Sequence, residues 1–144
     1  MSPLEVFFDN CTSPVFAGCL NALIEPDGDE ARHVRFMPDY GFTHSTKDVD
    51  WIAKLGSEPA AQWIVITGDQ RIRKNLAERA AWIKAGLKAF VLAPVYQKTP
   101  INQGASVLLW RWPQMKAFVE QAAPGSMFEL SINRRTGFVP LAVK

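Results

Sequence analysis

The sequence has few cysteines, no long apolar run and no strong excess of either charge. Cys11 and Cys19 are its only cysteines; they form no CxxC pair, and neither has a histidine at metal-ligand spacing, which argues against a cysteine-based metal site. The formal net charge of +2 does not by itself indicate a nucleic-acid partner. No apolar stretch is long enough to span a bilayer and no basic-then-apolar signal sequence opens the chain, so the expected location is the cytoplasm.

The length and composition are those of a single globular domain. A chain of 144 residues with 48% hydrophobic and 21% charged residues can bury one proper core. We therefore expect one domain over residues 1–144. Its core should cover about 4–122, followed by a C-terminal extension over about 124–144.

Short runs of apolar residues predict the strands of a parallel sheet. Most of these runs are unbroken rather than alternating, which is typical of strands buried on both faces. The run over 33–37 alternates weakly and is the least regular of them. The expected strands are Leu4–Phe8, His33–Met37, Trp63–Thr67 and Ala89–Ala93.

Helical patterns separate these strands. Ser13 and Pro14 are an N-cap and a first-turn proline, and they predict a helix with one apolar stripe. Capping-box spacing predicts two further helix starts, the first leading to a helix from about Lys47 to Gly56 and the second to a helix that ends at Gly86. The capping pairs are Ser45 with Asp48 and Asn75 with Glu78. The apolar residues of the last helix are expected to be Leu76, Ala80 and Ile83, with Trp82 beside them.

The strands and helices alternate, so the fold class is α/β. This order implies right-handed crossovers and a mainly parallel sheet with helices on both faces. Residues 95–104 are predicted to form a loop, and 105–122 a helix that Pro113 should kink or split. Alternation of apolar residues around the turn at 133–137 then predicts a C-terminal β-hairpin, with Pro140 on an edge strand.

Aspartates occur where the expected strands end. Asp9 follows the first strand directly, and Asp69 follows Gly68 after the strand at 63–67. Because the carboxyl ends of parallel strands share one edge of a sheet, these side chains should face the same site as Asp48 in the first turn of its helix. Carboxylates at close range repel by roughly 4 kcal/mol per pair at about 4 Å and an effective dielectric near 20. Such a cluster calls for a cation, and oxygen-only ligands favour Mg²⁺ or Mn²⁺ over zinc.

Each acid also has a purely structural interpretation. Asp9 could form a turn with Asn10, Asp48 could be a helix cap, and Asp69 could belong to a Gly-Asp turn. Asp50 lies two residues after Asp48 and points to another side of the helix, so it could at most hydrogen-bond water that is bound to the metal. The convergence of three acids from distant segments favours the metal site.

Basic residues follow Asp69 directly. Arg71, Arg73 and Lys74 precede a helix, where positive charge opposes the helix dipole. A bound phosphate would offset that cost, although a solvated helix start is the alternative. We expect these three side chains to contact a phosphate group.

Residues 4–94 resemble the PIN-like nucleases, most closely the VapC-type toxins of bacterial toxin–antitoxin pairs. The matching pieces are Phe7-Phe8-Asp9-Asn10, Asp48-x-x-Trp51-Ile52, the run from Trp63 to Ile72, Glu78-Arg79 and the Trp112-Pro113 helix. The resemblance implies a three-layer α/β/α sandwich, a Mg²⁺- or Mn²⁺-dependent endoribonuclease activity, and an antitoxin that blocks the site. By this resemblance, Asp9, Asp48 and Asp69 correspond to the acidic residues that bind the metal and carry out catalysis in the family.

The resemblance has a departure and leaves alternatives. Many PIN nucleases carry a fourth acid near the third, whereas residues 68–71 contain a single acid, Asp69. Asn10, Thr67 or Asp50 could substitute for the fourth acid by hydrogen-bonding metal-bound water. A non-catalytic PIN-like module that only binds RNA or protein is one rival function. A haloacid-dehalogenase-type phosphatase is another, disfavoured because Cys11 occupies the second place of its D-x-D motif. The C-terminal hairpin is a candidate surface for a homodimer or for the antitoxin.

Overall fold

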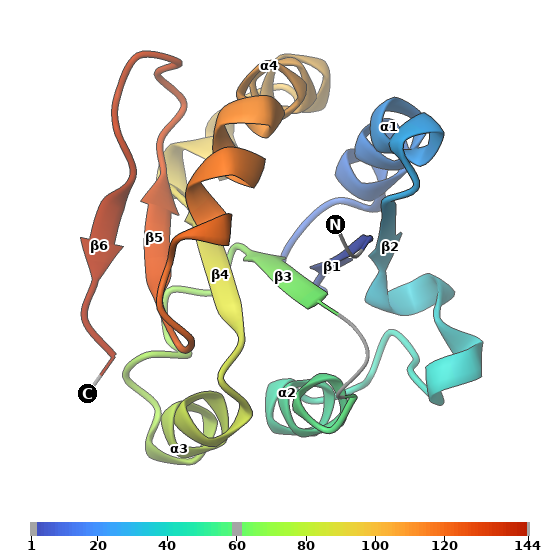
Figure 1. Ribbon diagram of the computed structural model, residues 1–144, viewed down its shortest axis with the longest axis vertical. Coiled ribbons are helices and arrows are strands. Elements are labelled where there is room, and N and C mark those ends of the chain that lie inside the picture. The colour runs from blue at the N-terminus through green and yellow to red at the C-terminus, as the bar shows by residue number, and fades with distance from the viewer. Residues whose placement is uncertain (1–2, 59–61, 144) are drawn as a thin grey trace.

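The computed structural model describes residues 3–58 and 62–143, which form an α/β fold around one six-stranded sheet (Figure 1). The strand order is β2-β1-β3-β4-β5-β6. The first five strands are parallel to one another, and β6 is antiparallel to β5. This confirms the predicted fold class. The strands are β1 Leu4–Phe8, β2 Glu30–His33, β3 Gln62–Thr67, β4 Lys88–Leu92, β5 Met127–Leu130 and β6 Val139–Leu141.

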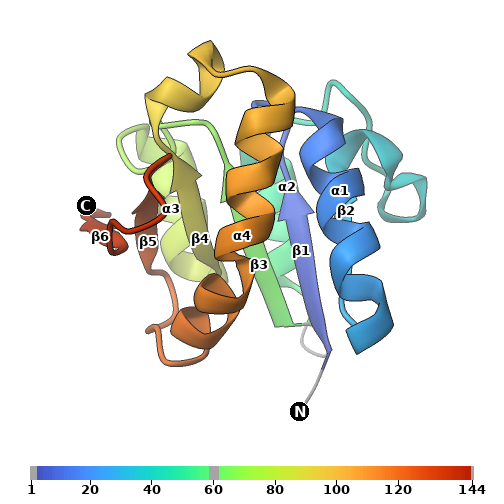
Figure 2. The same ribbon diagram turned by 90° about the horizontal axis from the view of Figure 1, so that it is seen from above.

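Helices cover both faces of the sheet and make three layers (Figures 1 and 2). One face packs on α1 (Pro14–Ile24) and α4 (Ile101–Glu120), and the other on α2 (Asp48–Gly56) and α3 (Leu76–Ala85). Successive residues of β3 enter opposite cores, which explains why its sequence is apolar without alternation. Within the described part of the chain, no helix combines the length and apolar character needed to cross a bilayer.

The second strand lies earlier than predicted. It covers Glu30–His33, and the residues from Val34 to Phe36 form a 3-10 turn instead of continuing it. His33 ends the strand because its Nδ1 accepts a hydrogen bond from the backbone N–H of Arg35 at 3.2 Å. The weak alternation over 33–37 comes from Val34 and Phe36, but the turn buries Val34 and Met37 and leaves Phe36 exposed.

The start of α2 also differs from the predicted capping box. Lys47 is the N-cap and makes no side-chain capping bond, while Ser45 belongs to a preceding turn in which its N–H donates to Thr43 Oγ1 at 3.1 Å. The Asp48 carboxylate is therefore not used as a cap. It accepts a hydrogen bond from Trp51 Nε1 at 2.9 Å and faces the sheet edge.

The third helix begins and ends as predicted, but its buried side was assigned wrongly. Asn75 Oδ1 accepts from the N–H groups of Ala77 and Glu78, both at 3.1 Å, and Gly86 ends the helix with φ +69°. Leu76, Ala80 and Ile83 are exposed. Of the expected apolar residues, Trp82 is the one that is fully buried, and because residues four apart share a helix face, it brings Glu78 toward the sheet.

The C-terminal part forms the predicted hairpin and extends the same sheet. β5 pairs with β4 in parallel and with β6 in antiparallel, and Pro140 lies in the edge strand β6. The helix before it, α4, starts at Ile101 and continues unbroken through Pro113, so the predicted loop over 95–104 is too long and the predicted split does not occur. Pro113 is exposed, and the apolar residues on either side of it keep the helix packed on the sheet.

Candidate metal centre

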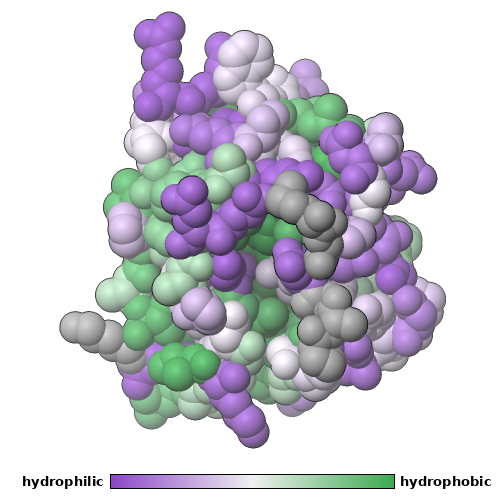
Figure 3. All heavy atoms as spheres, in the orientation of Figure 1, coloured by the Kyte–Doolittle hydropathy of each residue, from purple (hydrophilic) through white to green (hydrophobic). Residues whose placement is uncertain are grey.

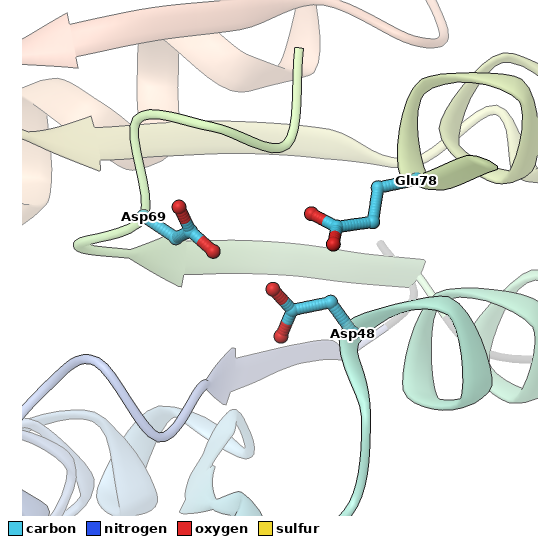
Figure 4. Close-up of side chains that lie close together, drawn as sticks. All are labelled: Asp48, Asp69 and Glu78. Atoms are coloured by element: carbon cyan, nitrogen blue, oxygen red, sulfur yellow. The ribbon is translucent and has the colours of Figure 1, made fainter. Parts of the chain in front are cut away.

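Three carboxylates from separate elements meet at the carboxyl edge of the sheet (Figure 4). Asp69 follows β3, Asp48 is the first residue of α2, and Glu78 lies in the first turn of α3. One oxygen of each carboxylate lies within 4.8 Å of those of the other two. Both helices begin at this edge, so their first turns face the end of the central strand.

The donor set of this acidic cluster, Asp48, Asp69 and Glu78, fits a hard divalent cation. All three ligand groups are carboxylate oxygens, the donors that Mg²⁺ and Mn²⁺ prefer. Glu78 Oε1 is buried and has no hydrogen-bond partner in the described part of the protein. Burying a carboxylate oxygen without a partner is costly, and a cation between the three groups would offset that cost.

Crowding separates the pKa values of Asp48 and Asp69. Burial and the adjacent Asp69 carboxyl raise the pKa of Asp48 to about 6, although the bond from Trp51 opposes this. Burial also acts on Asp69, but hydrogen bonds from the Asp48 carboxyl and from Arg71 outweigh it and hold the pKa of Asp69 below its usual value. The pair therefore shares a proton in the metal-free protein near pH 6.

Asp9 lies behind the acidic cluster and is fully buried. Its Oδ1 accepts from the N–H of Cys11 at 3.2 Å, and its Oδ2 accepts from the hydroxyl of Thr67, whose Oγ1 accepts from the N–H of Asp69 at 2.9 Å. Among the described residues, the three carboxylates whose oxygens lie within 4.8 Å of one another are those of Asp48, Asp69 and Glu78, and Asp9 is not one of them. Asp9 and Thr67 thus hold the backbone from which Asp69 projects.

The stability of the metal-free protein should depend on pH through Asp9. Burial raises the pKa of its carboxyl to about 7, above the ordinary value near 3.8, so the folded state favours the protonated form. The resulting stability is fully present below about pH 4 and is lost as the pH rises through about 7. We expect urea unfolding in EDTA to show about 2–4 kcal/mol of this loss. An Asp9→Asn variant should lack it; an identical pH profile for the variant would contradict the assignment.

The other residues predicted to hydrogen-bond metal-bound water have other surroundings in the structure. The Asn10 amide joins two loops, since Nδ2 donates to His44 O at 2.5 Å and Oδ1 accepts from Arg35 Nε at 3.1 Å. Asp50 is exposed on α2. Thr67 contributes through its bond to Asp9.

Of the three basic residues predicted to bind phosphate, Arg71 contacts the acidic cluster. The Arg71 side chain is 82% exposed, yet its Nε is 3.2 Å from Asp69 Oδ1 and its N–H donates to the same oxygen at 2.8 Å. Lys74 is exposed, and Arg73 is partly buried with its Nε unpartnered in the described residues. Positive charge is thus available beside the acids, where a phosphate would lie.

Gly68 has a steric role beneath Asp69. A Cβ at this position would lie 2.9 Å from the carbonyl oxygen of Cys11, a contact that forces the backbone to move. We expect Gly68→Ala to lower the free energy of unfolding by about 1–3 kcal/mol. Urea denaturation checks this, with Gly18→Ala as the matched control: a Cβ there meets nothing within 4 Å, and alanine is favoured in a helix. Equal effects of the two changes would refute the role.

Cys11 is a thiol at neutral pH. Desolvation of its sulfur and the neighbouring carboxylates of Asp9 and Asp69 raise its pKa to about 12, although the residue as a whole is exposed. A thiol rather than a thiolate is a poor nucleophile, so the site chemistry does not rest on this residue.

Glu78 is the residue of the acidic cluster that sequence reasoning missed. Its spacing from Asn75 is also that of a capping partner, a role that accounts for a glutamate at this position without a metal. The available signal was its place in the first turn of the helix that follows the central strand. The same reasoning had placed Asp48 at the sheet edge.

Comparison with known proteins gives one finding. A family model described as a PIN-like domain matches residues 4–94, well over half of the chain. The matched region includes β1 to β4, all three members of the acidic cluster and Asp9. No curated protein and no solved structure gave a significant match.

Proposed function

The chain belongs to the PIN-like domain family, and on this premise we propose that it is a metal-dependent endoribonuclease. The observation that carries the proposal is the acidic cluster, with its buried and unpartnered Glu78 oxygen, at the carboxyl edge of the sheet. A hard cation on carboxylates beside basic side chains suits the hydrolysis of a phosphodiester.

Asp48, Asp69 and Glu78 would hold a Mg²⁺ or Mn²⁺ ion. When bound, such an ion supplies an activated water and stabilises the charge that develops on the phosphate. Asp9 as a further ligand stays a prediction; its hydrogen bonds through Thr67 give it a positioning role for Asp69. Glu78 takes the place of the fourth acid that residues 68–71 do not supply.

Arg71 is the residue best placed to hold the RNA backbone. Its guanidinium is exposed while Asp69 fixes its Nε, so its remaining N–H groups can meet a phosphate oxygen. We propose that Arg73 and Lys74 extend this contact along the strand.

Replacing Arg71 with alanine should weaken RNA binding regardless of sequence. Loss of one phosphate contact should reduce the slope of log K against log salt by about 1. Fluorescence anisotropy with a labelled single-stranded RNA in EDTA measures this without cleavage. Lys84→Ala is the control, since Lys84 is exposed in the last turn of α3, away from the acids. An unchanged slope for Arg71→Ala would exclude the contact.

A toxin role with a cognate antitoxin is the finer form of the proposal. It is supported by the sequence resemblance to VapC-type toxins. The hairpin of β5 and β6 offers a surface for the antitoxin or a second copy: Phe118 and Val139 are exposed there, and hydrophobic side chains gather on that side of the molecule (Figure 3). Growth arrest on expression, relieved by a small protein encoded in the neighbouring reading frame, would support this role, and the absence of arrest would contradict it.

The test of the core proposal is cleavage of RNA by the purified protein. With Mn²⁺ we expect endonucleolytic products that EDTA abolishes, and no products from an Asp69→Asn variant purified in the same way. RNA that is bound but left intact would reject the nuclease in favour of the non-catalytic module. Products that are equal for the variant would point to a contaminant and also reject it.

A further inference from the structure

A small pocket opens at the same edge of the sheet as the acidic cluster. Most of its lining residues follow the ends of β1, β3 and β4 or belong to the segment that passes from β4 to α4. Figure 2 shows how this segment runs from the end of β4 to α4. Cys11 and Gly68 line it, and they are the neighbours of residues that form or support the metal centre. Its floor comes from the core between the sheet and the α1–α4 layer, whereas the acidic cluster lies toward α2 and α3. The loop that carries Asp69 therefore separates two adjacent sites.

The pocket is small and has an apolar floor. Its volume is about 180 Å³, room for about six water molecules at roughly 30 Å³ each. Phe16, Leu92 and Tyr96 form the floor and are themselves buried. Tyr96 offers its ring rather than its hydroxyl, because the hydroxyl donates to Ser131 O at 3.0 Å. These walls suit one flat ring system and exclude a ligand of drug size.

Several polar side chains line the pocket, and most of them make local hydrogen bonds; Ser13 Oγ, for example, accepts from the N–H of Val15 at 3.2 Å. The hydroxyls of Thr12 and Thr99 are used locally, since they donate to Asp9 O at 2.8 Å and Val95 O at 2.7 Å. Gln97 is exposed, and none of the hydrogen bonds among the described residues uses its side-chain amide. An amide presents a donor and an acceptor side by side, which is the arrangement that meets the polar edge of a nucleobase.

We propose that this pocket binds the base of the nucleotide next to the cleaved phosphodiester, with Gln97 contacting the edge of the base. The inference rests on the proposed ribonuclease function, which places a phosphate at the acidic cluster. Single-stranded RNA can splay an unstacked base away from its backbone, and proteins recognise such bases by apolar walls and hydrogen bonds to the base edges. Gly68 joins the two sites: it borders the pocket and immediately precedes Asp69.

Nucleoside binding tests the pocket without the metal centre. Isotope-labelled, metal-free protein is titrated by NMR with adenosine, cytidine, guanosine and uridine, which carry no phosphate. We expect saturable shifts at Gly68, Thr99 and other pocket residues for at least one nucleoside, and weakening by about tenfold in Gln97→Ala. Gln103→Ala, exposed in the first turn of α4 and not part of the pocket, should bind as the wild type does. No saturable shifts at the pocket, or equal binding by Gln97→Ala, would overturn the proposal.

Cleavage of short RNAs tests the base-binding pocket separately from the proposed ribonuclease function. Cleavage with Mn²⁺, together with a base preference that Gln97→Ala reduces, supports both. Cleavage without nucleoside binding would overturn the pocket alone. Nucleoside binding by a protein that cuts no RNA would overturn the nuclease, and with it the placing of the base beside a cleaved bond.

Discussion

Replacing Asp48 with asparagine should abolish RNA cleavage and at the same time stabilise the metal-free protein. The activity should fall by more than about 100-fold, because the change removes a charged ligand from the acidic cluster. The stability should rise by about 1 kcal/mol at pH 8, because burial and Asp69 disfavour the ionised form of this carboxyl, whose pKa is raised to about 6. Asparagine keeps an oxygen that can accept the bond from Trp51 Nε1.

Asp50→Asn is the matched control for this pair of effects. It makes the same change of charge on the same helix, but Asp50 is exposed and lies outside the acidic cluster. Its activity and stability should stay near those of the wild type. The gain from Asp48→Asn should also shrink as the pH falls toward 4, where the wild-type carboxyl is protonated in the folded protein. A loss of activity accompanied by a loss of stability would mean that Asp48 supports the fold rather than a metal ion.

Mn²⁺ should raise the unfolding temperature of the wild-type protein by about 5–10 °C at a concentration near 100 times its dissociation constant. The ion binds the folded state, where three carboxylates converge, and finds no such arrangement in the unfolded chain. The ion also offsets the repulsion between the three carboxylates of the metal-free protein. Thermal denaturation followed by circular dichroism in Mn²⁺ and in EDTA measures the shift.

Asp69→Asn should lose most of this stabilisation while still folding. Equal shifts in the wild type and the variant would show that Mn²⁺ acts elsewhere on the protein. Mg²⁺ should act in the same direction as Mn²⁺, since both prefer carboxylate oxygens.

The layout of the sheet could be predicted because its strands carry an unusual pattern. The segment from Trp63 to Ile66 is apolar without alternation, as expected of a strand with both faces buried, and both of its faces are covered. The second strand was misplaced because Val34 and Phe36 alternate with polar residues, although Phe36 is exposed and the 3-10 turn buries Val34 and Met37. Local burial patterns therefore identify elements well where they are long and unbroken, and poorly at short turns.

The candidate site was predictable only in part, and the reason is helix rotation. Asp48 and Asp69 follow from the rule that strand ends share an edge. Glu78 required knowing which side of α3 faces the sheet, and the apolar residues Leu76 and Ile83 indicated the wrong side. Trp82 decides the rotation because its indole is buried and donates to Gly125 O at 2.9 Å, a contact with a segment 43 residues away. No local pattern encodes that contact.

The arrangement behind the acids depends on side-chain positions that spacing does not reveal. Asp9, Thr67 and Asp69 form a chain of hydrogen bonds in which Asp9 and Thr67 are 58 residues apart in the sequence. β1 and β3 are neighbours in the sheet, so Phe8 and Ile66 are paired and the residues that follow them meet. The acid at the end of β1 could be predicted, whereas its use as a support for Asp69 emerges only from the packed structure.

Calorimetric titration of the metal-free protein with MnCl₂ tests the central claim most directly. We predict a saturable site in the wild type, binding at least tenfold weaker in Glu78→Gln, and binding like the wild type in Asp50→Asn. A titration without saturable heat, or a Glu78→Gln variant that binds Mn²⁺ as tightly as the wild type, would contradict the claim that Asp48, Asp69 and Glu78 hold one divalent ion.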